Sequence, residues 1–400
     1  MKKREKQIGV GTLEISPLAR KYVNDVLDTN RLSYGPYSEK FERRFAEIHN
    51  RKFGIFCNSG TSALQVSLAV LKEMNGWQDG DEVIVPAVTF VATSNIVLQN
   101  NMTPVFVDVS PVSYNIAPQK IEEAITSKTK AIIPVNLFGL SCEIDEIKKI
   151  AQKYNLKIIE DSCEAMFVEY KGRPVGSMSD IACFSTYVAH LLVTGVGGLI
   201  LTDDPQIAIL ARSICNHGRD SIYLKIDDDQ VDDSKRKNVI AGRFNFERMG
   251  YSFRATELEA AIGLAQLEEN YLEDIKQRQT NAFKIAFGLN KFGLDKYLQL
   301  TWNPYSNEHA FMMYPIVVHK NRKIKRDDLV NYLECHNIET RPMLPLLNQP
   351  FYKKKFGDIE KNYPVAKWIN NNGFYIGCHQ GLSNEDIEYI IEVFKNFFEK

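Results

Sequence analysis

The residues best suited to chemistry in this chain begin with a glycine loop. Asn58-Ser59-Gly60-Thr61-Ser62 stands between an expected strand at 53–57 and an expected helix from Gly60 to Leu71. Glycine lets the backbone approach an anion, the start of a helix offers free N–H groups, and the hydroxyls add donors. The loop therefore fits a phosphate-binding site. A simple helix cap would use the same residue types.

Two carboxylates, Glu160 and Asp161, end the apolar run 157–161. In open α/β sheets, ligands bind at the carboxyl ends of the strands. An ionised Asp161 could hold a pyridine nitrogen protonated, which makes such a ring an electron sink. A helix cap or a salt bridge is the alternative role.

His190 is a residue that can move protons near neutral pH. It follows Ser185, whose hydroxyl could meet a phosphate, and it precedes the segment Thr194-Gly195-Val196-Gly197-Gly198. Phe90 could stack on an aromatic cofactor, or it could belong to the core.

Alternating strands and helices must position these side chains. Continuous β-branched runs at 53–57, 82–86, 104–108, 131–135 and 157–161 alternate with helical patterns such as 144–154. This alternation predicts an α/β fold with a buried, mostly parallel sheet. A polar segment at 221–248 reads as a surface loop or a flap, and one long helix is expected from Ala255 to about Ile275.

The chain divides on these patterns into a large domain, 1–285, and a smaller α+β domain, 286–400. We expect the N-terminal segment to pack on the small domain. The chain has 400 residues, 44% of them hydrophobic, and a net charge of −1. Nothing in this balance calls for a nucleic-acid or membrane partner, so a soluble cytoplasmic protein is expected. The seven cysteines are dispersed and include no Cys-x-x-Cys pair, so no metal site is expected.

Seven motifs in fixed order are more specific than any one of them. They are Asn58-Ser59-Gly60-Thr61-Ser62-Ala63-Leu64, Pro86-Ala87-Val88-Thr89-Phe90-Val91-Ala92-Thr93, Asn136-Leu137-Phe138-Gly139, Glu160-Asp161, Ser185 to Gly198, Gly250-Tyr251-Ser252-Phe253-Arg254 and Thr340-Arg341-Pro342. The series resembles the DegT/DnrJ/EryC1/StrS sugar aminotransferase family, over nearly the whole chain. The resemblance implies the aspartate-aminotransferase-like fold type I, with a mostly parallel seven-stranded sheet, and a homodimer with composite active sites.

The resemblance also implies roles for matching residues. Family members bind pyridoxal phosphate, and its phosphate would be held by Gly60, Thr61, Ser62 and Ser185. Phe90 would stack on the ring and Asp161 would pair with its nitrogen. Glu164 takes the position of a usual Gln or His near the ring hydroxyl. Two positions depart from the pattern: Ser252 replaces an Asn that reaches the partner subunit's phosphate, and Val196 replaces an acidic residue.

His190 occupies the position of the family's cofactor-binding lysine. No lysine occurs from Gly172 to Leu224, so no neighbour readily replaces that amine. The family has a branch with this replacement, the nucleotide-sugar 3-dehydratases that use pyridoxamine phosphate, and His217 matches a second histidine of that branch. The expected activity is C3 dehydration of a nucleotide-linked 4-keto-6-deoxyhexose, with His190 as base and an amino donor such as glutamate.

Three alternatives stay open at this point. The first is a nucleotide-sugar aminotransferase of the same family, which the changes at Val196 and Ser252 keep in consideration. The second is a catalytically silent homologue that binds cofactor. The third is a histidine introduced by engineering.

Overall fold

The structure is a computed structural model and describes residues 4–219, 237, 244–269, 271–301, 308–320 and 324–399. The segment predicted at 221–248 lies outside the described residues, apart from Lys237 and 244–248.

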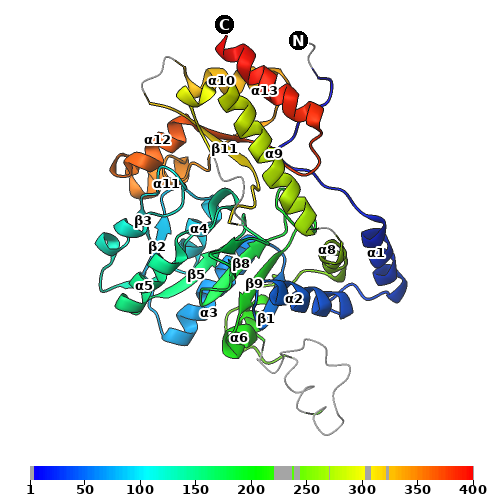
Figure 1. The fold of residues 1–400 in the computed structure, drawn as a ribbon. Coiled ribbons are helices and arrows are strands. Elements are labelled where there is room, and N and C mark those ends of the chain that lie inside the picture. Colours follow the sequence, from blue (N-terminus) through cyan, green and yellow to red (C-terminus); the bar gives the residue numbers. More distant parts are fainter. Residues whose placement is uncertain are drawn as a thin grey trace.

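A seven-stranded sheet forms the centre of the large domain, in the order β1-β9-β8-β5-β4-β2-β3 (Figure 1). All its strands run in one direction except β9, which is antiparallel to both neighbours. The strands are β1 (Phe53–Cys57), β2 (Glu82–Pro86), β3 (Thr103–Val107), β4 (Thr129–Ile132), β5 (Lys157–Asp161), β8 (Ile181–Ser185) and β9 (Gly198–Thr202). The predicted α/β class with a mostly parallel sheet is confirmed.

Both faces of this sheet are buried. Val83 and Val85 of β2 join one hydrophobic core, whereas Ile84 between them joins a second core on the opposite face. Strands covered on both sides are apolar in continuous runs, which explains why the sequence pattern located them. The helices of this domain are α1 (Pro17–Thr29), α2 (Pro36–Ile48), α3 (Gly60–Asn75), α4 (Val91–Gln99), α5 (Ile144–Tyr154), α6 (Pro205–Cys215) and α8 (Glu257–Glu268), and β6 (Glu169–Tyr170) and β7 (Arg173–Pro174) form a small hairpin.

The single helix expected from Ala255 to Ile275 is wrong. Two helices occupy this stretch, α8 and the longer α9 (Tyr271–Lys291). Thr256 caps α8 with a reciprocal bond to Glu259, and Glu269 leaves the helical region with φ −102° and ψ −118°. The apolar spacing continues across this break, so it could not reveal the change of direction.

A four-stranded antiparallel sheet, β10-β11-β13-β12, forms the small domain at the top of Figure 1. Its core also takes in Ile8, which pairs with Ile338, and Ala282, Ile285 and Leu289 of α9. The predicted boundary at 285 therefore falls inside α9. The elements are β10 (Leu298–Leu300), β11 (Tyr314–Val318), α10 (Arg326–Cys335), β12 (Thr340–Pro342), α11 (Pro350–Phe356), α12 (Pro364–Asn372), β13 (Gly373–Ile376) and α13 (Asn384–Phe398).

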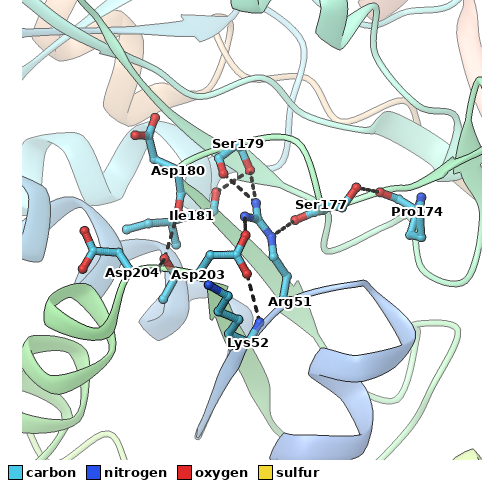
Figure 2. A network of polar contacts seen from close by, with 11 residues as sticks. Arg51, Lys52, Pro174, Ser177, Ser179, Asp180, Ile181, Asp203 and Asp204 are labelled. Carbon is cyan, nitrogen blue, oxygen red and sulfur yellow. Dashed lines mark hydrogen bonds and ion pairs between the residues drawn. The ribbon is translucent and has the colours of Figure 1, made fainter.

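One buried arginine ties together three strands at one edge of the large sheet (Figure 2). Arg51, just before β1, donates to the carbonyls of Gly176 and Ser179, both at 2.6 Å. Its Nη1 also pairs with Asp203, just after β9, at 2.9 Å. The network lies at the ends of β1, β8 and β9 that are remote from Gly60, Ser185 and Gly198.

Candidate active site

A cavity of about 410 Å³ lies at the carboxyl ends of β1, β5 and β8. This is the edge of an α/β sheet at which ligands bind. The lining residues are Val10, Ser59, Gly60, Thr61, Leu64, Thr89, Phe90, Ala92, Thr93, Val135, Asp161, Cys163, Glu164, Ser185, Tyr187, Ala189, His190, Val196, Gly197, Met312, Met313, Leu344 and Tyr375. Seven of the ten predicted site residues are therefore brought together: Gly60, Thr61, Phe90, Asp161, Glu164, Ser185 and His190.

The Gly60 loop approaches β8 so closely that only glycine fits. A Cβ at position 60 would lie 2.7 Å from Ser185 Cβ and 2.8 Å from Cys163 Sγ. Ser59 caps α3 by accepting the Ser62 N–H at 3.0 Å, while Gly60 and Thr61 line the cavity at the helix start. Free N–H groups in a first helical turn suit a phosphate.

Ser62 is placed differently from the other members of this loop. It does not line the cavity, because its hydroxyl donates to Asn58 Oδ1 at 2.7 Å within the cap. Ser59 lines the cavity instead, and its position as cap residue was visible in the sequence.

Asp161 presents a buried carboxylate to the cavity. Thr93 Oγ1 donates to its Oδ2 at 2.8 Å, and the Cys163 N–H donates to Oδ1 at 3.2 Å. Burial raises the pKa of Asp161, and the two hydrogen bonds oppose that rise. Among the described residues no arginine, lysine or histidine pairs with it. A protonated ring nitrogen would supply the missing positive charge.

Glu164 is a second buried carboxyl group in the cavity. Its Oε2 accepts the Phe138 N–H at 2.6 Å, and Phe138 has a left-handed backbone with φ 58°. Burial raises the pKa of Glu164 to about 8, with the nearby Asp161 charge adding to the rise. At neutral pH this group is therefore largely protonated and can donate a hydrogen bond.

His190 lies in the turn that follows β8, where its N–H donates to Tyr187 O at 2.9 Å. The ring lines the cavity, and Nδ1 is buried without a hydrogen-bond partner. Burial lowers the pKa of His190 to about 4, against a smaller opposing effect from the Cys163 backbone. The imidazole is therefore neutral at physiological pH, which is the state a general base requires.

Phe90 and Val196 stand at the more open side of the cavity, exposed by 56% and 50%. Phe90 is the residue before α4, and it lines the same cavity as Asp161. The aromatic face is available for stacking on a planar ring.

His217 and Ser252 lie together but outside this cavity. Asn216 pairs with Ser252 in an isolated bridge, and both His217 and Ser252 are exposed. The described chain by itself therefore does not bring these two residues to the cavity.

The small domain and the N-terminal segment supply five of the lining residues that sequence reasoning did not place at the site: Val10, Met312, Met313, Leu344 and Tyr375. Val10 is held by its N–H bond to Glu339 Oε2 at 2.8 Å, a contact between residues 329 positions apart. No local pattern signals a contact of that range.

Two kinds of feature are absent from the described part of the chain. No group of three or more His, Cys, Asp or Glu residues there is placed to hold a metal ion. No helix there has the length and apolar character needed to cross a membrane.

The cavity fits pyridoxal phosphate in three independent respects. The Gly60 loop leaves room for a phosphate, Asp161 lacks a cationic partner, and Phe90 offers a stacking face. Together with the sheet order, they define an enzyme of the pyridoxal-phosphate-dependent aminotransferase fold. The chain belongs to the DegT/DnrJ/EryC1/StrS aminotransferase family, whose model matches residues 14–395.

Two kinds of enzyme occur among the named relatives. GDP-perosamine synthase of Caulobacter vibrioides is 33% identical over 390 residues, which is 96% of each chain. GDP-4-keto-6-deoxy-D-mannose 3-dehydratase of Escherichia coli O55:H7 is 30% identical over 390 residues, covering 94% of this chain and 97% of the relative.

Two solved structures of 3-dehydratases are similar to this chain over nearly its whole length. A variant of GDP-4-keto-6-deoxymannose 3-dehydratase (ColD) with bound GDP-perosamine superimposes with a TM-score of 0.86 at 28% identity, covering 96% of this chain and 99% of the other. The E. coli 3-dehydratase with bound hydrated pyridoxal phosphate gives a TM-score of 0.83 at 28% identity, covering 98% of this chain and all of the other.

Proposed function

We propose that this protein removes the C3 hydroxyl of a nucleotide-linked 4-keto-6-deoxyhexose, with pyridoxamine phosphate as cofactor. The observation that carries the proposal is His190: a neutral imidazole lines the cavity, and no lysine lines it in the part of the chain that the structure describes. Without a lysine amine in the cavity, the cofactor has no covalent anchor and its amine form can persist. Both 3-dehydratase structures described above support this choice.

In this proposal, different residues of the chain have different roles in the reaction. Bound pyridoxamine phosphate supplies an amine that reacts with the C4 ketone and a ring that accepts electrons. Gly60, Thr61 and Ser185 would hold the phosphate, and Asp161 would keep the ring nitrogen protonated. His190 would act as the base beside the bound cofactor and would supply the proton with which the C3 hydroxyl leaves as water. The products are a 3-deoxy-4-keto sugar and ammonia, and an amino donor restores the cofactor.

The protein works as a homodimer in this proposal. His217 and Ser252 are exposed beside each other, so they are free to reach a partner's cavity. There His217 would assist the departure of the hydroxyl and Ser252 would contact the phosphate. Glutamate is the proposed amino donor, because a solved 3-dehydratase, 28% identical to this chain, holds pyridoxal phosphate trapped with glutamate.

Transamination of the same class of sugar is the second candidate. GDP-perosamine synthases of Caulobacter vibrioides, Escherichia coli O157:H7 and Vibrio cholerae, at 33%, 32% and 28% identity, favour it. The reaction would leave a stable 4-amino sugar, so the two candidates differ in product rather than in substrate.

A product assay separates them. The protein is incubated with pyridoxamine phosphate, glutamate and a GDP-4-keto-6-deoxyhexose, and the sugar products are identified by mass spectrometry alongside an ammonia assay. We expect a 3-deoxy keto sugar with equimolar ammonia. An amino sugar without ammonia would overturn the dehydratase proposal in favour of transamination. Absence of any turnover, with cofactor bound, would favour a silent homologue.

A further inference from the structure

Arg341, the second residue of a motif that has no role so far, lies beside the cavity. Thr340-Arg341-Pro342 forms β12, and in the register of the small sheet Arg341 lies directly opposite Tyr375 of β13. Side chains at directly opposed positions of an antiparallel pair project to the same face. Tyr375 lines the cavity, so Arg341 is the direct neighbour of a cavity-lining residue.

Among the described residues, the lining of the cavity contains the carboxyl groups of Asp161 and Glu164 but no lysine or arginine. Arg341 is the cation that acts on a lining side chain: burial and Glu164 raise the pKa of Tyr375, and the Arg341 charge opposes that rise. A substrate that carries an anionic oxygen group would therefore find a positive charge beside Tyr375.

The guanidinium remains available to a ligand. Its side chain is 50% exposed, its Nη1 donates only to the adjacent Thr340 carbonyl at 2.8 Å, and its Nη2 pairs with Glu339. Glu339 has a second function, because its other oxygen accepts the Val10 N–H. The Arg341 side of this ion pair is open to solvent, which weakens such pairs, so a ligand anion can compete with Glu339 for Arg341.

We propose that Arg341, with Tyr375 beside it, is the docking point for an anionic oxygen group of a substrate, and that Glu339 holds the arginine until the ligand arrives. The proposal rests on the proposed function, which supplies two sources of this chemistry: a carboxylate of the amino donor or the diphosphate of the nucleotide sugar. A planar guanidinium binds either group through two parallel hydrogen bonds.

The test measures equilibrium binding, without turnover, to the protein loaded with pyridoxal phosphate. Glutarate is the carboxylate probe and inorganic pyrophosphate the diphosphate probe, each titrated by calorimetry. For Arg341→Gln we expect Kd to rise about 10-fold or more for one or both probes. A rise for glutarate alone assigns the amino donor, and a rise for pyrophosphate alone assigns the nucleotide sugar. Unchanged Kd values for both probes would overturn the proposal.

Two matched variants make the result specific. Glu339→Gln removes the competing charge but keeps an oxygen for the Val10 N–H, so we expect it to tighten binding of the same probe. Weakened binding in Glu339→Gln would contradict the docking role, since it would mean that the ion pair serves only the local structure. Arg173→Gln breaks a similar exposed pair with Asp145, remote from the cavity, and serves as control. None of these outcomes depends on whether the product assay finds a keto sugar or an amino sugar.

Discussion

Burial shifts the pKa values of two ionisable groups of the cavity, Glu164 and His190, in opposite directions. Glu164 keeps its proton to a pKa of about 8, and His190 stays neutral down to a pKa of about 4. Desolvation disfavours the charged form in both cases, which raises the pKa of the acid and lowers that of the base. At neutral pH the cavity therefore contains both a neutral base, His190, and a protonated acid, Glu164.

Glu164→Gln tests the first of these states through stability. Between pH 4.5 and about 8 the folded protein keeps the Glu164 proton that the unfolded chain releases, so stability falls as pH rises through this window. Glutamine cannot titrate and still accepts the Phe138 N–H. We expect the free energy of unfolding of the variant, relative to the native protein, to increase by a few kcal/mol from pH 5 to pH 8 in urea titrations. The same change at the exposed Glu123 is the control, and parallel curves for both variants would refute the assignment.

His190→Lys tests whether position 190 can hold the cofactor. A buried lysine loses its charge readily, so its neutral amine is available to react with the aldehyde of pyridoxal phosphate. We expect a covalent link at residue 190, fixed by borohydride reduction and located by peptide mass mapping. His217→Lys, outside the cavity, is the control and should give little modification under the same conditions. An unmodified Lys at position 190 would argue against the placement of this residue beside the cofactor.

At the scale of elements, the close contact between the start of α3 and the end of β8 is the feature that shapes the phosphate site. Gly60→Ala would force a methyl group to within 2.7 Å of Ser185 Cβ, so one of the two elements must move. We expect the affinity for pyridoxal phosphate to fall about 10- to 100-fold, measured by fluorescence titration, with the circular dichroism spectrum unchanged. Gly11→Ala is the matched control, because its nearest contact would be an ordinary 3.8 Å from Ala189 Cα. Equal affinities in the two variants would refute this account.

The elements also mark how far the sequence alone could lead. The strands at 53–57, 82–86 and 157–161 and the helix at 144–154 were predictable because each is specified by its own apolar pattern. The cavity-lining residues next to these elements could be predicted as well, because they lie at the ends of the strands.

Contacts between distant segments could not be predicted in this way. The hydrogen bond between Val10 and Glu339 and the position of Tyr375 depend on how the small domain docks, which no local pattern encodes. The break between α8 and α9 is similar, because the apolar spacing runs through it without interruption.

At the scale of the whole molecule, one end of β1, β8 and β9 forms part of the cavity and the other end contributes to the stability of the fold. Their ends near Gly60, Ser185 and Gly198 build the cavity, whereas their opposite ends are joined by Arg51 (Figure 2). Arg51 is 7% exposed and is the donor to two backbone carbonyls, while its partner Asp203 is about half exposed. Loss of the Arg51 side chain would therefore affect the two buried carbonyls more than it would affect the half-exposed Asp203.

Arg51→Met removes these donors and keeps the aliphatic volume. The two carbonyls are left without their partner in a buried setting, which we expect to lower the free energy of unfolding by about 2–4 kcal/mol. Activity per folded molecule should stay unchanged, because the cavity lies at the far ends of the same strands. Arg173→Met, which breaks an exposed ion pair with Asp145, should cost about 0–1 kcal/mol and controls for loss of a surface charge. Urea denaturation and turnover per folded molecule measure the two quantities separately, and a fully folded Arg51→Met protein with impaired turnover would show that the two ends of the sheet are coupled after all.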